Sequence, residues 1–138
     1  MKNIYSISSF LFAIAATLFA PFTSLSQCDY TISMTDSWGD GWNGAAISVS
    51  VNGAVTNVSC SGSSTTSTVP TEDGAIVEFT WTGGSFDSEC AAQIFAPDGS
   101  GAYQFVASEA PSNGSLFYQE TANAPGCDPP PLCTQGGV

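Results

Sequence analysis

Basic side chains are almost missing from this sequence. Lys2 is its single Lys or Arg residue and it has no His, whereas Asp and Glu number 12 and bring the formal net charge to -11. A Ser-His-Asp or Cys-His nucleophile, a catalytic lysine, an arginine clamp for phosphate and a histidine metal site are therefore excluded. Nucleic acid is excluded as a partner, because binding it requires Lys or Arg to neutralise phosphates.

The same absence leaves the carboxylates without basic partners. All 12 acids follow residue 26, so the chain beyond that residue contains no cationic side chain. Water, backbone N–H groups or a bound cation must compensate these charges. We expect the cation to be calcium.

The first 26 residues are typical of a secretory signal peptide. Lys2 precedes an apolar stretch at residues 10–20, and Ser24 and Ser26 form a small-x-small cleavage pattern. The apolar stretch is 11 residues long, whereas a membrane span needs about 20. We predict a secreted or cell-surface protein with no transmembrane span after cleavage. Lipid attachment at Cys28 is the alternative, because residues 25–28 loosely resemble a lipobox.

Export exposes the five cysteines to an oxidising environment, where they tend to pair. Without His or C-x-x-C spacing a zinc cluster is disfavoured, and an odd number predicts two disulfides and one leftover thiol. The sequence does not fix the connectivity. Our preferred pairs are Cys28 with Cys127 and Cys60 with Cys90, which leaves Cys133 in the tail.

Strand signals fill the chain between the signal peptide and the tail. Apolar and polar residues alternate at 30–35, 47–51 and 75–81, as a half-buried strand requires. Asn52-Gly53 and the turn at residues 97–99 predict two hairpins. Further strands are expected at 90–96, 102–107 and 115–120, while the Ser/Thr/Gly run at 61–68 fits an edge strand or a loop.

About seven short strands without helical periodicity predict an all-β fold, an antiparallel two-sheet β-sandwich of jelly-roll-like type that contains disulfides. The sandwich domain is expected over residues 27–127. Residues 128–138 are rich in Pro and Gly and are predicted to form a C-terminal tail or linker.

Residues 36–44 (DSWGDGWNG) are the densest group of chemically informative residues. They combine the oxygen-bearing side chains Asp36, Asp40 and Asn43 with three glycines and the tryptophans Trp38 and Trp42. Glycines allow a tight loop in which oxygens converge, and calcium takes six to eight oxygen ligands. The spacing is not that of an EF-hand loop.

A second acidic cluster, Asp87-Ser88-Glu89, follows two glycines and opens a predicted strand. A neighbouring loop would bring Glu89 or Asp87 against the first motif, and we favour Glu89. The predicted calcium ligands are therefore Asp36, Asp40, Asn43, Asp87 and Glu89. In the alternative interpretation, the first motif only forms Asx turns and both tryptophans belong to the core.

The two motifs resemble a known extracellular domain. Residues 30–44, the hairpin at Asn52-Gly53, residues 81–89 and Asp98-Gly99 are similar to the DSxGDGWNG-type β-domain that recurs in secreted and surface proteins of Bacteroidota. The resemblance covers about Cys28 to Cys127. It implies a non-catalytic surface, adhesion or matrix module with calcium-type acidic loops.

Our leading functional hypothesis is a calcium-stabilised module for adhesion, surface coating or filament and matrix assembly. Glycans, other surface or matrix proteins and further copies of the chain are its expected partners. The alternative is a lectin-like module that binds carbohydrate through Trp38 and Trp42. A glycosidase using Asp87 with Glu89 or Asp36 has less support, because such a small domain leaves little material for a substrate cleft.

Overall fold

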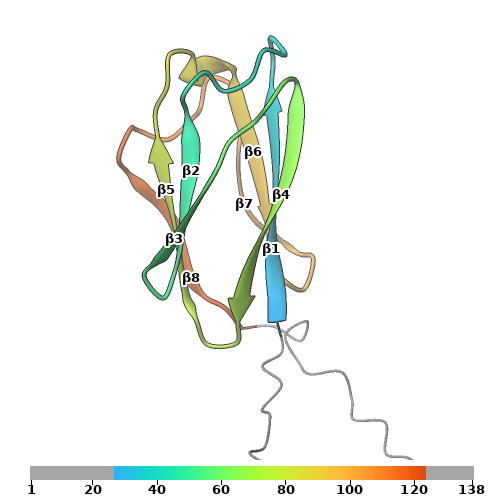
Figure 1. Ribbon diagram of the computed structural model, residues 1–138, viewed down its shortest axis with the longest axis vertical. Coiled ribbons are helices and arrows are strands. Elements are labelled where there is room, and N and C mark those ends of the chain that lie inside the picture. The colour runs from blue at the N-terminus through green and yellow to red at the C-terminus, as the bar shows by residue number, and fades with distance from the viewer. Residues whose placement is uncertain (1–26, 124–138) are drawn as a thin grey trace, which may run out of the picture.

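Eight strands and one short 3-10 helix make up the described part of the chain. The computed structural model describes residues 27–123 (Figure 1). The elements are β1 (Gln27–Asp36), β2 (Ala46–Val51), β3 (Ala54–Val58), β4 (Ser64–Glu72), β5 (Ile76–Thr82), η1 (Asp87–Glu89), β6 (Cys90–Phe95), β7 (Gly101–Phe105) and β8 (Leu116–Thr121).

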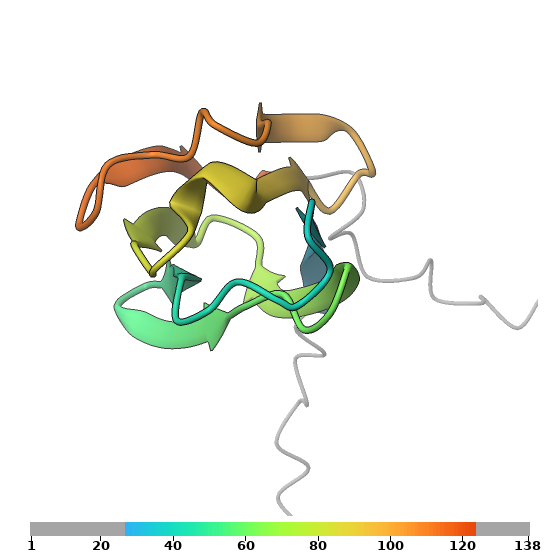
Figure 2. The ribbon, with the colours of Figure 1, turned by 90° about the horizontal axis from the view of Figure 1, so that it is seen from above.

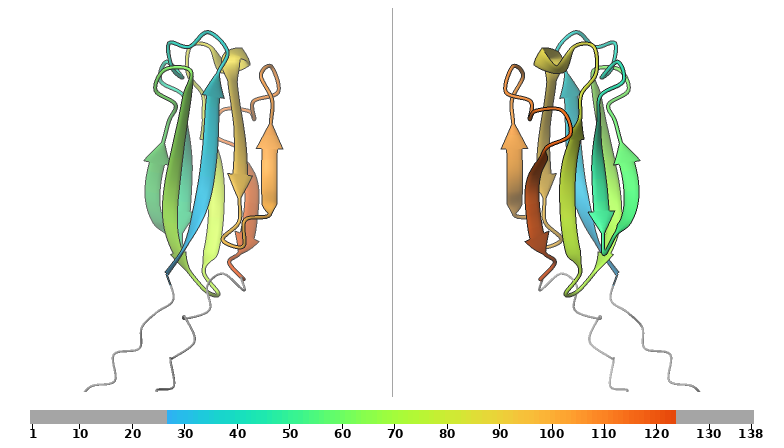
Figure 3. Two further views of the ribbon diagram at one scale, coloured as in Figure 1. Left: turned by 90° about the vertical axis from the view of Figure 1, so that its right-hand side faces the viewer. Right: turned by 90° about the vertical axis from the view of Figure 1, so that its left-hand side faces the viewer.

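The strands form two four-stranded antiparallel sheets, with the orders β4-β1-β6-β7 and β3-β2-β5-β8. The sheets pack face to face, as the side views in Figure 3 show. The antiparallel two-sheet β-sandwich predicted from the sequence is thus confirmed. Only the pairs β2–β3 and β6–β7 are consecutive neighbours within one sheet, so every other connection crosses between the sheets.

Local sequence explains the strands and the first hairpin. β2 and β5 alternate buried and less buried residues, because one face of each lies on the core. Asn52 and Gly53 have φ angles of 48° and 89°, the left-handed conformation that a two-residue hairpin turn requires. The ambiguous Ser/Thr run is largely strand β4, which pairs with β1 from Gln27↔Glu72 to Thr35↔Ser64.

The core lies between the sheets and is rich in aromatic rings. Phe79 on β5 contacts Tyr30 on β1 at a ring-centroid distance of 5.6 Å. Elsewhere in the core, the rings of Trp42 and Trp81 pack edge to face, with a centroid distance of 5.2 Å. The hydroxyl of Tyr30 also donates a hydrogen bond of 2.6 Å to Oε1 of Glu120, which links β1 of one sheet to β8 of the other.

The connections that cross between the sheets divide between the two ends of the sandwich. Residues 37–45, 59–63, 83–89 and 106–115 lie at the upper end in Figure 1, which Figure 2 views from above; we call it the loop end. The start of β1 lies at the opposite end, near the end of β8. Within residues 27–123, no helix is long and apolar enough to cross a membrane.

The core predicts a large cost for removing its central ring. Phe79→Ala deletes contacts with Tyr30, Phe117 and Tyr118 and should lower the free energy of unfolding by about 3–5 kcal/mol. Val55→Thr is the control, because Val55 is 62% exposed on the edge strand β3 and its replacement should change stability by less than about 0.5 kcal/mol. Urea titration measures both, and equal losses would contradict this packing.

Candidate functional site

The loop that joins β1 to β2 is folded around the side chain of Asp36. This carboxylate is only 5% exposed. Its Oδ1 accepts a hydrogen bond from the backbone N–H of Trp38 at 3.2 Å, and its Oδ2 accepts one from Gly41 at 2.7 Å. Burial alone would raise the pKa of Asp36, but the hydrogen bonds from these backbone amides outweigh it and hold the pKa below its ordinary value.

Gly41 shows why the loop needs glycine. Its φ angle is 95°, and a Cβ atom there would lie 3.0 Å from the carbonyl oxygen of Cys60. A side chain would therefore be strained and crowded at the same time. Glycine lets the Gly41 N–H reach Asp36 while the backbone passes close to the β3–β4 connection.

A second loop, at residues 83–89, packs directly on the first. Gly84 lies so close to it that a Cβ atom would clash with the backbone N of Ala45. The Ser85 N–H donates to the carbonyl of Asn43 at 3.3 Å, and the Ser37 N–H donates to the carbonyl of Glu89 at 3.1 Å. These backbone contacts hold the start of β6 beside the end of β1.

The two loops bring three carboxylates together. One oxygen each from Asp36, Asp40 and Glu89 lies within 4.8 Å of the others. Burial raises the pKa of Glu89, and repulsion from Asp36 and Asp40 raises it further. No Lys, Arg or His occurs in residues 27–123 to neutralise the group. We call these three residues the carboxylate cluster.

The other two predicted ligands have different partners. The side-chain amide of Asn43 donates to the carbonyl of Gly41 at 2.8 Å, and Asn43 itself has a φ angle of 46°. Asp87 accepts hydrogen bonds from the Gly84 N–H at 2.6 Å and from the Trp81 indole at 3.4 Å. Asp87 lies outside the carboxylate cluster. Both side chains hold the loops in shape, as the turn interpretation of the motif expected for Asn43.

The two tryptophans of the first motif lie in opposite environments. Trp42 is 1% exposed, and its indole N–H donates to the carbonyl of Thr35 at 2.9 Å. Its prediction as a ligand contact is wrong, because the core covers the ring. Trp38 is 81% exposed. Together with Phe86, Asp40 and Glu89 it lines a shallow pocket of about 220 Å³.

Phe86 is a residue of this pocket that the sequence analysis did not select. It is 52% exposed and lies one residue before η1. A large apolar side chain between two glycines and an acidic pair is the only local signal for it. A single exposed apolar residue is ordinary on a protein surface, so the approach of the two loops, which places Phe86 beside Trp38, is what identifies it.

The predicted bond between Cys60 and Cys90 is not formed, and both residues are free, buried thiols. Their sulfur atoms have different carbonyl partners: Cys60 Sγ lies 3.4 Å from Gly62 O, and Cys90 Sγ lies 3.6 Å from Phe86 O. Burial, with help from nearby carboxylates, raises the pKa of Cys90 to about 12. Cys127 and Cys133 lie outside the described residues, so the pairing of Cys28 with Cys127 stays a prediction.

Comparison of the chain with models of protein families, with curated proteins and with solved structures finds no match. The resemblance to the Bacteroidota module therefore stays a prediction from the motifs.

The hydrogen bonds of Asp36 predict a structural role that does not depend on any cation. In a chelator, Asp36→Ala should lower the free energy of unfolding by about 1–3 kcal/mol, because the amides of Trp38 and Gly41 lose their acceptor. Asp40→Ala should cost no stability under the same conditions, since Asp40 is exposed and its removal relieves repulsion. Thermal melts in EDTA compare the two variants. Equal destabilisation would contradict the assigned difference.

Proposed function

We propose that this chain is a non-catalytic, secreted or cell-surface β-sandwich module that is stabilised by calcium and serves in adhesion, surface coating or matrix assembly. The observation that carries the proposal is the carboxylate cluster of Asp36, Asp40 and Glu89, formed by two loops of a chain that has no basic side chain in residues 27–123. The signal-peptide pattern and the resemblance of both motifs to a surface module support the location.

The chemistry of the available donors fits a hard cation. Three carboxylates offer up to six oxygens, and water can complete the six to eight ligands that calcium takes. Softer metals are disfavoured, since they prefer thiolates and all three groups of the cluster are carboxylates. When bound, the ion would supply positive charge and join the two loops that connect the sheets.

Burial of Asp36 supports a non-catalytic role. A glycosidase that paired Asp87 with Asp36 would need the Asp36 carboxylate to reach the sugar, but this side chain is 5% exposed and is bound by two backbone amides. In the pair of Asp87 with Glu89, the Asp87 carboxylate is already bound by the Gly84 amide and the Trp81 indole.

The proposal predicts that calcium chloride stabilises the protein more than sodium chloride does at the same ionic strength. A ligand present at a hundredfold excess over its Kd adds about 2.7 kcal/mol to the free energy of unfolding. Because extracellular calcium modules have Kd values of about 0.1–1 mM, melting temperatures are compared across millimolar calcium chloride and sodium chloride at matched ionic strength. Coincident series would remove calcium from the proposal.

Glu89→Gln distinguishes the effect of a bound ion on stability from the effect of repulsion among the carboxylates. In EDTA the variant should melt at or above the wild type, because repulsion with Asp36 and Asp40 is relieved. In calcium it should lose the stabilisation. Glu78→Gln, on the outer face of the other sheet, is the control that should keep the full calcium response.

The pH dependence has a definite sign. In the ion-free protein, the pKa of Glu89 is raised above its ordinary value of 4.5. Glu89 therefore contributes its full stabilisation below pH 4.5, and this stabilisation is lost as the pH rises through the folded-state pKa. The lowered pKa of Asp36 acts in the opposite direction, so its contribution is lost as the pH falls below its ordinary 3.8. The difference between melts in calcium and in EDTA should therefore grow from pH 4 to pH 7.

The exposed ring of Trp38 favours a second candidate function, carbohydrate binding at the loop end. Trp38 and Phe86 frame the acidic pocket, and aromatic rings can pack against the apolar faces of sugars. On a glycan array in calcium, Trp38→Ala should weaken binding about tenfold, equivalent to about 1.4 kcal/mol. Leu116→Ala removes a 50% exposed apolar residue from β8 and should leave binding unchanged. Unaltered binding by the Trp38 variant would exclude this candidate.

A further inference from the structure

The outer face of the sheet β4-β1-β6-β7 is distinct from the loop end in its chemistry. Strand alternation turns every second residue of these strands away from the core. Pairing aligns these outward residues in rows across the strands, for example Thr66, Ser33, Gln93 and Gln104. The adjacent rows hold Ser64, Thr35 and Ala91 on one side and Thr68, Thr31 and Phe95 on the other. None of these residues is charged, although the chain has 12 acids.

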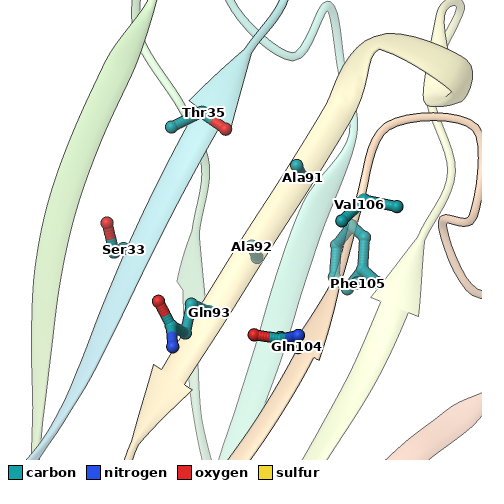
Figure 4. Close-up of a pocket in the computed structure, with 8 residues that line it drawn as sticks. All are labelled: Ser33, Thr35, Ala91, Ala92, Gln93, Gln104, Phe105 and Val106. Carbon is teal, nitrogen blue, oxygen red and sulfur yellow. The ribbon is translucent and has the colours of Figure 1, made fainter. Parts of the chain in front are cut away.

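Two adjacent pockets form a trough along β6 and β7 on this face. Ser33, Thr35, Ala91, Gln93, Gln104 and Val106 line a pocket of about 210 Å³, together with the edges of two core side chains (Figure 4). The small side chain of Ala91 leaves space between β1 and the end of β7. A second pocket, of about 270 Å³, shares Gln93 and Gln104 and continues past Gly101 and Ala102.

The polar groups of the trough are free to bind a ligand. Gln93, Gln104 and Thr35 are exposed, and Ser33 is partly exposed. In the part of the chain that the structure describes, the side chains of these four residues make no hydrogen bond. Each glutamine amide offers two donors and an acceptor, and each hydroxyl offers a donor and acceptors. Ala91 and Val106 add apolar surface between them.

The distribution of charge indicates what this face can bind. The acids of the described chain lie mostly at the two ends of the sandwich: Asp36, Asp40, Asp87, Glu89 and Glu109 at the loop end, and Asp29, Glu72, Asp73, Asp98 and Glu120 at the other. A cationic partner would be drawn to those ends, and a polyanion would be repelled by the net charge of -11. The uncharged rows instead match a neutral ligand that carries many hydroxyl groups.

We infer that this trough binds a segment of a neutral polysaccharide chain. Sugar hydroxyls exchange hydrogen bonds with Gln93, Gln104, Ser33 and Thr35, and the C–H faces of the sugars pack on Ala91 and Val106. Along β7 the two pockets extend from Gly101 to Phe105, over about 13 Å, given a rise of roughly 3.3 Å per residue. Two adjacent open pockets suit a chain better than a single sugar. This site is separate from the proposed calcium site and from Trp38.

Affinity electrophoresis of the purified protein tests the inference. Native gels are cast with hydroxyethyl cellulose, galactomannan, arabinoxylan or a soluble β-1,3-glucan, and with alginate as a charged comparison. We expect at least one neutral polysaccharide to retard the wild type, in EDTA as well as in calcium, and alginate to have no effect. Retardation by none of the neutral polymers would overturn the inference.

Matched variants locate the binding. Gln93→Ala with Gln104→Ala removes the amides, and Ala91→Gln fills the trough; each should raise the Kd from the gel series at least tenfold. Gln119→Ala, on the outer face of the sheet β3-β2-β5-β8, should leave the Kd unchanged. Thermal melts verify that each variant is folded.

Three further results would also overturn the inference: equal retardation of wild type and trough variants, loss of retardation in EDTA or in Trp38→Ala, and a concentration-dependent dimer in size-exclusion chromatography that the trough variants abolish. The second would assign the glycan to the loop end. The third would assign the face to a second copy of the chain. Failure of the calcium melts alone leaves the expected electrophoresis result unchanged, so the two proposals fail separately.

Discussion

A buried carboxylate held by backbone amides determines the shape of the loop end. Without Asp36 as an acceptor, the N–H groups of Trp38 and Gly41 would have no partner inside the tight turn. These two hydrogen bonds fix the path of the loop. The loop in turn places Asp40 beside Glu89 and leaves Trp38 exposed to solvent. The same loop delivers Trp42 to the core. The packing of Trp42 in the core and the position of the carboxylate cluster thus both depend on the side chain of Asp36.

Most strands could be predicted because the signals for them, alternating polarity and turn residues, lie within short stretches of the sequence. Alternation over residues 47–51 and 75–81 reflects burial of one face, and Asn52-Gly53 suits the turn between β2 and β3. The Ser/Thr run was ambiguous because its own residues do not decide between strand and loop. Pairing with β1 decides it. The order of strands across the two sheets is equally non-local, since most connections change sheet.

The candidate site was predictable in composition but not in geometry. The choice of Glu89 over Asp87 agrees with the cluster, but the reason lies in backbone contacts between two loops that no local pattern encodes. Trp38 and Trp42 are both flanked by polar residues or glycine, and only the three-dimensional path of the loop separates the exposed ring from the buried one. Cys60 and Cys90 are both core residues, and their sulfurs point to different carbonyls.

The positions of β1 and β8 have a mechanical consequence. β1 begins at the end opposite the loop end and is hydrogen-bonded on both sides, to β4 and β6. A load applied between a partner at the loop end and the start of β1 runs parallel to these strands. The ladders on both sides of β1 then resist it in shear, with many hydrogen bonds sharing the force, whereas peeling would break them singly. The Tyr30–Glu120 bond passes part of that tension to β8.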